Sequence, residues 1–459
     1  MSAVSAEIFL WGTNIGAVIW NAQQKVALFE YTSAFLASGI ELAPLTMPAG
    51  RKVFSFPDLK KGTYQGLPGM LADSLPDKFG NLLIDEWLVR TGRDQESFSP
   101  VERLCYIGSR GMGALEFRPS IRVRQGGAMP VDIAELVTLA NRALEEKKAL
   151  NTVFEKKSVE DTDAMRDILR VGTSAEDTDA MRDILRVGTS AGGARAKAVI
   201  AWNEATGEVR SGQVKAPVGF GYWLMKFDGV SENRDKELAD PLGFGQIEYA
   251  YYRMALAAGI DMNECRLYRE NGRSHFMTRR FDRTPEGQKV FMQTLCGIAH
   301  MDFNMAGGYS YEQALNVARK LGLDKSALEQ LFRRMVFNVF ARNQDDHTKN
   351  ISFLMNKKGR WSLSPAYDMV YSYNPDGAWT HQHQMRINGK VDRFVQQDFY
   401  AVARRFNIVS PAEVENILEE VDAAVGLWPK WASEADVSEE TVSYIASNHQ
   451  RLKSLSFDD

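Results

Sequence analysis

Short apolar runs separated by Gly, Pro and Asn fill the first part of the chain, up to about Val123. The runs EIFLWG, GAVIW and VALFEY, and later GALEFRPSIRV, have the length and the boundary residues of β-strands. A helical pattern interrupts them around Phe79 to Thr91. We therefore predict a β-containing N-terminal module with one helical insert and with a β-hairpin between Ile8 and Trp20.

The pattern changes twice after Pro130. The segment DIAELVTLANRALEEKKAL has apolar residues at helical spacing and a charged opposite face, and strands resume between Val199 and Phe227. From Glu248 to the end, helical patterns dominate, as in ALEQLFRRMVFNVFARN and PAEVENILEEVDAAVGLW. This order predicts a bilobal α+β protein. The predicted parts are a β-rich subdomain at 1–125, the rest of the N-terminal lobe at 126–245, and an α-helical lobe at 246–459.

Composition places the chain among ordinary globular proteins. It has 459 residues, 44% of them apolar and 25% charged, which is enough for large cores and two or three domains or subdomains. A net charge of -4 excludes a strongly basic protein that binds nucleic acid through its whole surface. Three distant cysteines give neither a disulfide framework nor a CxxC metal pair. No basic segment precedes the apolar N-terminus, so we expect no signal peptide, no membrane span and a cytoplasmic location.

A perfect tandem repeat stands outside this pattern. The sequence EDTDAMRDILRVGTSA occupies residues 160–175 and again residues 176–191, letter for letter. A solenoid needs three or more diverged units, so we interpret the repeat as an in-frame duplication. Each copy has Met, Ile and Leu at helical spacing after an Asp/Thr cap, which predicts a short helix. Accommodating sixteen extra residues costs about 1 to 2 kcal/mol of loop-closure entropy, so we expect the fold to survive.

The polar run NQDDHTKN (Asn343 to Asn350) carries the main candidate chemistry. Asp345 precedes Asn350 by five positions, and Asp368 follows in SPAYDM. Phosphoryl transfer needs a carboxylate beside the attacking hydroxyl and oxygen ligands for Mg²⁺, and protein kinases use the same Asp-to-Asn spacing. The alternative is a polar turn in which an aspartate caps a helix and His347 is exposed. An apolar helix before the run and a predicted hairpin after it, turning at Gly359, favour the kinase interpretation.

Two further segments fit a phosphate-handling site. Lys226 lies on the apolar strand YWLMKFD, where it either extends to solvent or meets an anion, and Glu248 on the next helix is its natural partner. The segment VGTSAGGARAKA has glycines at 192 and 193 whose N–H groups can approach phosphates, although it is no Walker A loop. A flexible turn explains that segment as an alternative. The glycines of IGSRGMGALEF are explained equally well by a tight strand entry.

Taken together, these segments resemble the HipA family of bacterial toxin kinases. The resemblance covers nearly the whole chain, and its motifs occur in the family's order. They are LADSLPDKFGNLL, IGSRGMGALEF, TSAGGARAKA, YWLMKFD, EYAYYRMALAAGI, MTRRFDR, FNVFARNQDDHTKN and SPAYDM.

The resemblance implies a HipA-like kinase fold, ATP with Mg²⁺ as cofactors, and a set of site residues. Asp345 would be the catalytic base, with His347 and Lys349 in the same loop. Asn350 and Asp368 would bind Mg²⁺, and Ser190 in the glycine-rich loop would be autophosphorylated. The nucleotide would be bound by Lys226, Glu248, Gly192, Gly193, Ala194, Arg280, Phe281 and Tyr367.

Substrate and partner expectations also come from the resemblance alone. Family members are serine/threonine kinases that modify aminoacyl-tRNA synthetases. A small helix-turn-helix antitoxin commonly neutralises them, so DNA is reached only through that partner. The duplication departs from the family because it supplies two loop serines, Ser174 and Ser190, and we expect it to modulate or switch activity. A small-molecule kinase and a switched-off scaffold that binds an antitoxin remain as alternatives.

Overall fold

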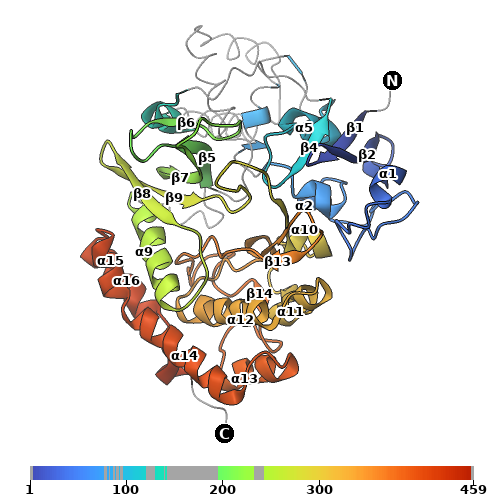
Figure 1. Cartoon of the computed structure of the whole chain (residues 1–459). Helices are drawn as coiled ribbons and strands as arrows, with labels where there is room; N and C mark the ends of the chain where they lie inside the picture. Colours follow the sequence, from blue (N-terminus) through green and yellow to red (C-terminus); the bar gives the residue numbers. More distant parts are fainter. Residues whose placement is uncertain are drawn as a thin grey trace, which may run out of the picture.

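The structure is a computed structural model, and its β-rich part lies above a mostly helical part (Figure 1). It describes residues 4–76, 97–119, 130–138, 140–141, 195–231 and 242–455, together with residues 80, 81, 83–85, 88, 92 and 93. The predicted α+β class is confirmed by this arrangement. The tandem repeat, and with it Ser174, Ser190, Gly192, Gly193 and Ala194, lies outside the described residues.

The N-terminal module is built on a four-stranded antiparallel sheet with the order β3-β2-β1-β4. Its first two strands form the predicted hairpin, whose two turn residues, Trp11 and Gly12, both have positive φ (50° and 84°) and so match the right-handed strand twist. The strands are β1 (Ser5–Leu10), β2 (Thr13–Asn21), β3 (Val26–Tyr31) and β4 (Leu115–Arg118). The helices are α1 (Ser33–Leu36), α2 (Lys61–Tyr64), α3 (Gly69–Ala72) and α5 (Pro100–Ile107).

A second sheet of five antiparallel strands has the order β6-β5-β7-β9-β8. Its central strands are almost entirely buried, which explains why they read as continuous apolar runs. The register pairs Lys226 of β7 with Lys197 of β5 on one side and with Phe276 of β9 on the other. The strands are β5 (Arg195–Trp202), β6 (Val209–Ser211), β7 (Gly221–Ser231), β8 (Cys265–Glu270) and β9 (Arg273–Arg279).

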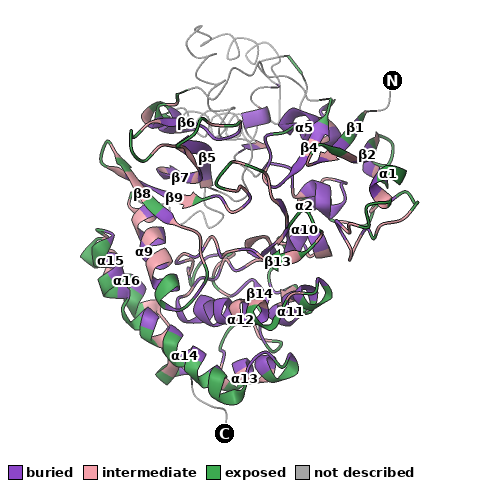
Figure 2. Cartoon of the chain, viewed as in Figure 1, coloured by how far each residue is buried: buried purple, intermediate pink, exposed green. Residues whose placement is uncertain are grey.

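The helical lobe packs around α12 (Lys325–Phe340), which is buried along most of its length (Figure 2). Asp324 caps its first turn by accepting a hydrogen bond from the Ala327 N–H. The helices at the lower edge have one exposed and one buried face, as their amphipathic patterns predict (Figure 2). The other helices of the lobe are α9 (Phe244–Ala257), α10 (Leu295–Ala299), α11 (Tyr311–Lys320), α13 (Gln396–Arg405), α14 (Pro411–Gly426), α15 (Trp428–Glu434) and α16 (Glu439–Asn448).

Two small sheets and two 3-10 turns complete the lobe. A three-stranded antiparallel sheet has the order β10-β12-β13, and a parallel pair joins β11 to β14. Phe291, Cys296 and Met355 belong to the same apolar cluster as the N-terminal module, so the small sheet joins the module to the lobe. The elements are β10 (Phe291–Thr294), β11 (Tyr309–Ser310), β12 (Ser352–Met355), β13 (Trp361–Leu363), β14 (Met385–Arg386), η2 (Thr348–Asn350) and η3 (Leu452–Ser454).

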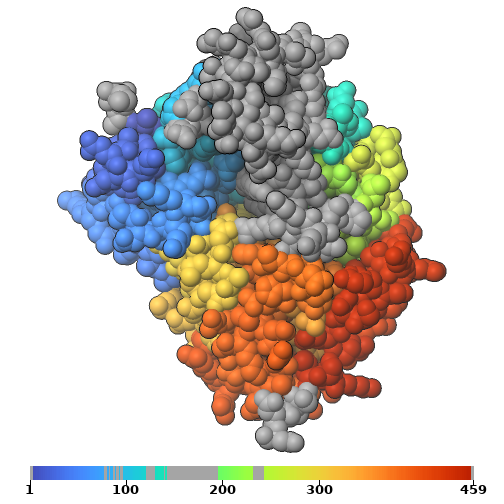
Figure 3. Space-filling view, turned by 180° about the vertical axis from the view of Figure 1, so that it is seen from behind, coloured from blue at the N-terminus to red at the C-terminus, as the bar shows by residue number. Residues whose placement is uncertain are grey.

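The surface view from behind shows the same division (Figure 3). The blue N-terminal module and the red C-terminal helices occupy different ends of the molecule, with yellow and orange residues of the lobe between them. The three cysteines are free and buried, as expected. No helix in the described part of the chain has both the length and the apolar composition needed to cross a bilayer.

Candidate active site

The run Asn343 to Asn350 forms a loop between α12 and β12, which we call the catalytic loop. It begins where α12 ends, since Arg342 has a positive φ of 54° and turns the chain out of the helix. The Asn343 side chain donates to Asn338 Oδ1 over 2.9 Å and so ties the loop to the last turns of α12. The predicted hairpin follows, with β12 and β13 paired and Gly359 (φ 75°) in its turn. Helix, loop and hairpin are therefore confirmed in the predicted order.

Asp345 lies on the open side of the catalytic loop, where 42% of its side chain is exposed. The Asn350 amide donates to the Asp345 backbone carbonyl over 2.8 Å, which closes the loop on itself. The indole N–H of Trp379 donates to Asp345 Oδ1 over 2.7 Å, and His347 Nε2 lies 3.8 Å from the same oxygen. The carboxylate is thus both accessible and oriented, as a general base requires.

Asp346, the next residue, is buried, with 1% of its side chain exposed. Its carboxylate accepts hydrogen bonds from the Tyr311 hydroxyl at 2.9 Å and from the Gln384 backbone N–H at 2.8 Å. His383 Nδ1 lies 3.0 Å from Oδ2. These partners satisfy the buried carboxylate and fix the loop to α11 and to the segment before β14.

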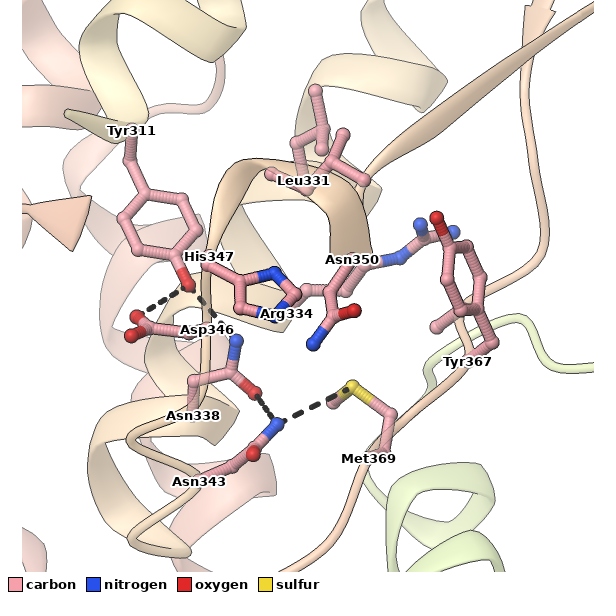
Figure 4. A pocket seen from close by; sticks show the side chains of 12 residues that line it. Tyr311, Leu331, Arg334, Asn338, Asn343, Asp346, His347, Asn350, Tyr367 and Met369 are labelled. Atoms are coloured by element: carbon pink, nitrogen blue, oxygen red, sulfur yellow. Dashed lines mark hydrogen bonds between the residues drawn. The ribbon is translucent and has the colours of Figure 1, made fainter. Parts of the chain in front are cut away.

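A small pocket lined by polar and apolar side chains lies beneath the catalytic loop, between α12 and the chain around Tyr367 (Figure 4). Asp346, Tyr311, Asn338 and Asn343 form a connected row of hydrogen bonds along one wall. The side chains of Asn350, Arg334 and Tyr367 occupy the other side (Figure 4). Burial lowers the pKa of Arg334 to about 10, and its guanidinium donates to the Ser364 carbonyl over 2.7 Å. The pocket wall therefore supports the loop from below.

Lys226 is the centre of the site. Its ammonium lies 2.5 Å from Glu248 Oε1 on α9 and 2.5 Å from Asp368 Oδ1, and only 7% of its side chain is exposed. The predicted pair of strand lysine and helix glutamate is therefore present, and the predicted ligand Asp368 lies at the same point. Burial opposes the charged form, but the two carboxylates outweigh it and raise the pKa of Lys226. Lys226 is therefore a positive charge fixed between α9 and Asp368.

Asp368 has a positive φ of 53°, a conformation that non-glycine residues seldom adopt and that often marks a functional site. Burial favours its neutral form, yet Lys226 and Lys197 together hold the pKa of Asp368 below its ordinary value. Its backbone carbonyl accepts a weak bond of 3.4 Å from the Asn343 amide. Asp368 is therefore ionised and attached to the catalytic loop.

Glu248 binds a second cation at the first residue of β5. Arg195 donates to Glu248 Oε2 over 3.2 Å, and its guanidinium stacks 3.7 Å from the centre of the Phe244 ring. The Glu248 carboxylate is buried, with 1% of its side chain exposed, and its two ion pairs attach β5 and β7 to α9.

The remaining loop residues pack against the chain that follows α10. The Lys349 ammonium lies 4.6 Å from the centre of the Phe303 ring, and the His347 ring packs against the same phenylalanine with centroids 5.3 Å apart. The Thr348 hydroxyl donates to the Met301 carbonyl over 2.6 Å. The catalytic loop is therefore held by the chain after α10 on one side and by the partners of Asp346 on the other.

The residues predicted to bind the nucleotide base lie in two different environments. The rings of Phe281 and Tyr367 lie together, with centroids 5.5 Å apart, and the Tyr367 hydroxyl donates to the Lys349 carbonyl. Arg280, in contrast, is wholly buried and forms a two-pronged ion pair with Asp282 at 2.8 and 2.7 Å. Phe281 and Tyr367 thus adjoin the catalytic loop, whereas the Arg280 side chain has its partner inside the protein.

Sequence reasoning missed several residues of the site and its support. Asp282 accepts from the Gly113 N–H over 2.7 Å, and Arg283 donates to the Gly113 carbonyl over 3.0 Å. The backbone of this glycine-rich segment therefore binds the ion pair of Asp282 and Arg283. These contacts explain the glycines structurally, without a ligand. Trp379 and Gln384 were also missed, although the segment NPDGAWTHQHQ, polar but containing a tryptophan, could have pointed to them.

The oxygen donors fit the predicted Mg²⁺. Mg²⁺ is usually bound by one or two side-chain oxygens together with substrate phosphates and water. Asp368 would supply a carboxylate, and Asn350 would supply an amide oxygen, since its N–H₂ group already donates to Asp345. Within the described parts of the chain no three His, Cys, Asp or Glu residues form a metal cluster, so nucleotide phosphates would have to complete the coordination.

Comparison with known proteins gives relatives over part of the chain. A putative kinase, Y4dM, from Sinorhizobium fredii (strain NBRC 101917 / NGR234) is 28% identical over 171 residues, which cover 33% of this chain and 37% of that protein. A second putative kinase from the same strain, Y4mE, is 24% identical over 156 residues, covering 32% of this chain and 34% of the relative. The chain thus matches about a third of the length of each.

Wider matches come from a solved structure and from family models. The HipA of Shewanella oneidensis MR-1, solved with HipB and operator DNA, aligns over 96% of this chain and 94% of that chain, with a TM-score of 0.61 and 17% identity. At that identity the match shows the fold. The HipA N-terminal domain model matches residues 6–118, and the HipA-like C-terminal domain model matches residues 189–428, more than half of the chain. The chain therefore belongs to the HipA family.

Proposed function

We propose that this protein is an ATP-dependent protein serine/threonine kinase. One observation carries the proposal: Lys226 bridges Glu248 and Asp368 beside a loop that presents Asp345 and Asn350. Four separate segments of the chain thereby supply a phosphate-binding cation, oxygen ligands for Mg²⁺ and an accessible carboxylate.

Each residue has a defined role in this reaction. Asp345 takes the proton of the acceptor hydroxyl, whose oxygen forms a bond to the γ-phosphorus. The bond from that phosphorus to the bridging oxygen breaks, and ADP leaves with the electron pair. Lys226 holds phosphate oxygens, and Glu248 holds Lys226. Asn350 and Asp368 would hold Mg²⁺, which would screen the negative charge of the phosphates.

The pair of rings formed by Phe281 and Tyr367 supports a place for the adenine base, because stacked or tilted aromatic rings bind flat heterocycles. The backbone around Arg280 and the glycines Gly192 and Gly193, with Ala194, complete the proposed nucleotide site. His347 and Lys349 complete the catalytic loop. We assign autophosphorylation to Ser190 of the glycine-rich segment on the resemblance to HipA kinases.

The proposed substrate and partner also rest on the family. An aminoacyl-tRNA synthetase is the proposed acceptor, and a small helix-turn-helix protein the proposed antitoxin through which DNA is reached. The structural relative from Shewanella was solved with HipB and operator DNA, which supports such a partner. We place the protein in the cytoplasm, where both would be available.

Transfer of radiolabelled γ-phosphate tests the proposal. The purified chain is incubated with labelled ATP and Mg²⁺, alone and with aminoacyl-tRNA synthetases, and the labelled residue is identified by mass spectrometry. Phosphoserine or phosphothreonine on protein is the expected result. Transfer only to aminoglycosides or choline would identify a small-molecule kinase instead, and ATP binding without any transfer would identify a switched-off scaffold.

The tandem repeat adds a regulatory element to the proposed kinase. Its second copy ends one residue before Gly192 and contains Ser190, and the first copy contains Ser174 at the equivalent position. We propose that the extra copy alters the position or release of the glycine-rich segment. Deleting residues 160–175 and measuring ATP affinity and autophosphorylation in both forms tests this, and equal values in the two forms would contradict it.

A further inference from the structure

Trp379 makes the only described side-chain hydrogen bond to the proposed base. Its indole N–H donates to Asp345 Oδ1 over 2.7 Å, which is short for an N–H···O bond and typical of a charged acceptor. Within the described residues no hydrogen bond reaches the other oxygen, Oδ2. The carboxylate therefore has one oxygen fixed and one oxygen left for a substrate.

Gln384 fixes the chain that carries Trp379. Its side-chain amide donates to the Trp379 carbonyl over 2.6 Å and to the Gln344 carbonyl over 3.3 Å. Its backbone N–H donates to Asp346 Oδ1 over 2.8 Å. Since Gln384 is buried, the segment of Trp379 is attached to the catalytic loop both at its backbone and at its indole.

We propose that Trp379 is a positioning residue that orients the Asp345 carboxylate, so that Oδ2 faces the incoming hydroxyl. The inference rests on the proposed kinase function and adds a residue to it. A carboxylate on a flexible stem rotates freely unless a partner holds one oxygen, and misplacing a reacting group is costly in rate. The indole supplies that partner, and Gln384 holds the backbone of the residue that carries it.

A blocking role for Trp379 is the rival explanation, and the contact geometry opposes it. An ionised carboxylate has about four lone-pair sites, and the indole uses one of them. The Asp345 side chain remains 42% exposed with the indole bond in place. A hydroxyl can therefore approach Oδ2 while Trp379 holds Oδ1.

The test removes the N–H group and keeps the ring. Replacing Trp379 by β-(3-benzothienyl)alanine exchanges the N–H for sulfur at nearly constant shape, and Trp379→Phe is a simpler second variant. Both should lower kcat for phosphate transfer about tenfold, the usual size of a lost hydrogen bond to a charged group. The KM for ATP should stay within about twofold, because the base does not contact ATP in the ground state.

A matched control is available elsewhere in the chain. Trp11 is also partly buried, and its indole donates to the Lys289 carbonyl over 2.9 Å, in the N-terminal module. Trp11→Phe loses an equivalent bond and should leave kcat unchanged. Supplying 5-fluorotryptophan, which keeps the N–H, should preserve the activity of the chain.

The outcomes separate the two proposals. Unchanged kcat in both Trp379 variants would overturn the positioning role, and increased kcat would show that Trp379 blocks the base. The contact itself is tested without turnover: in ¹⁵N-tryptophan-labelled protein, Asp345→Ala should move the indole resonance of Trp379 and leave that of Trp11 in place. A moved resonance in a chain that transfers no phosphate to any acceptor would confirm the contact and overturn the proposed function.

Discussion

Adjacent aspartates in the catalytic loop, Asp345 and Asp346, differ in almost every contact. Asp345 belongs to the open side of the loop, where 42% of its side chain is exposed and one indole N–H is its hydrogen-bond donor. Asp346 belongs to the buried side, together with the network of Tyr311, Asn338, Asn343 and His383, where each carboxylate oxygen has a partner.

The difference shows how one short polar run serves two purposes. On the open side, the Asp345 carboxylate is charged and only partly paired, which is tolerable because the side chain is near solvent. The buried side needs every polar group satisfied, because an unpaired buried carboxylate would destabilise the fold. The proposed function assigns chemistry to Asp345 and structural support to Asp346. Measuring both activity and stability in variants of each residue tests this division.

The largest effect is expected at Asp345. Asp345→Asn should lower phosphate transfer about a thousandfold, because an amide cannot accept the hydroxyl proton. The melting temperature should stay within about 1 °C, since Trp379 can donate to the amide oxygen as well. Radiolabel transfer and calorimetry measure the two quantities. Retained turnover would remove Asp345 from the role of base.

The reverse pattern is expected at Asp346. Asp346→Ala leaves the Tyr311 hydroxyl and His383 without their acceptor and should lower the free energy of unfolding by about 3 kcal/mol. Urea unfolding followed by fluorescence measures it, with Asp345→Ala as the matched control that should cost less than about 1 kcal/mol. Equal losses in both variants would end the distinction between the two sides.

A smaller effect on catalysis is expected at Glu248. Glu248→Gln removes the charge that holds both Lys226 and Arg195, and it leaves Asp368 as the carboxylate partner of Lys226. The kcat/KM for ATP should fall about tenfold. Because Lys226 should then associate more strongly with Asp368, we also expect a higher Mg²⁺ requirement. An unaltered Mg²⁺ dependence would argue against the proposal that Asp368 binds both Lys226 and Mg²⁺.

The smallest effect concerns pH and His300, which lies where the helical lobe contacts the N-terminal module. Burial lowers the pKa of His300 to about 4, and the neutral ring accepts a hydrogen bond from the Gly69 N–H over 3.0 Å. Between pH 6.5 and 4 the unfolded chain binds a proton that the folded chain does not, so stability falls as the pH falls through that window. His300→Gln keeps an acceptor and does not titrate.

The expected result is a flatter pH dependence in this variant. Acidification from about pH 7 to about pH 5 should lower the Tm of the unsubstituted chain by a few degrees more than that of His300→Gln. Scanning calorimetry at several pH values measures this difference. Parallel curves would show that His300 does not couple protonation to stability.

Much of the fold could be predicted from local patterns. The hairpin at the N-terminus, the strand of Lys226, the helix before the catalytic loop and the hairpin after it have strong periodicity and clear turn residues. The order of strands in the five-stranded sheet could not be predicted, because β9 joins β7 across the whole of α9 and β8. Such pairing depends on long-range packing rather than on local sequence.

The site could be predicted only where a motif has a fixed spacing. Asp345 and Asn350 were predicted from such a spacing, whereas Asp368 and the pair of Lys226 with Glu248 were predicted from the order of elements in kinases and from the resemblance. Contacts between remote segments were missed. Trp379 reaches Asp345 across 34 positions, and Gly113 reaches Asp282 across 169, and no local pattern encodes either meeting.

The cluster of Arg280, Asp282 and Arg283 has a consequence for the modularity of the family. The two family models match separate stretches of the chain, which invites the exchange of one part between relatives. Yet Gly113, in the first stretch, supplies both a donor and an acceptor to the ion pair of the second. Because these are backbone groups at a residue with a positive φ of 73°, a chimera whose first part holds this backbone elsewhere would bury charges with unmet hydrogen bonds, so the two parts should be inherited, or swapped, together.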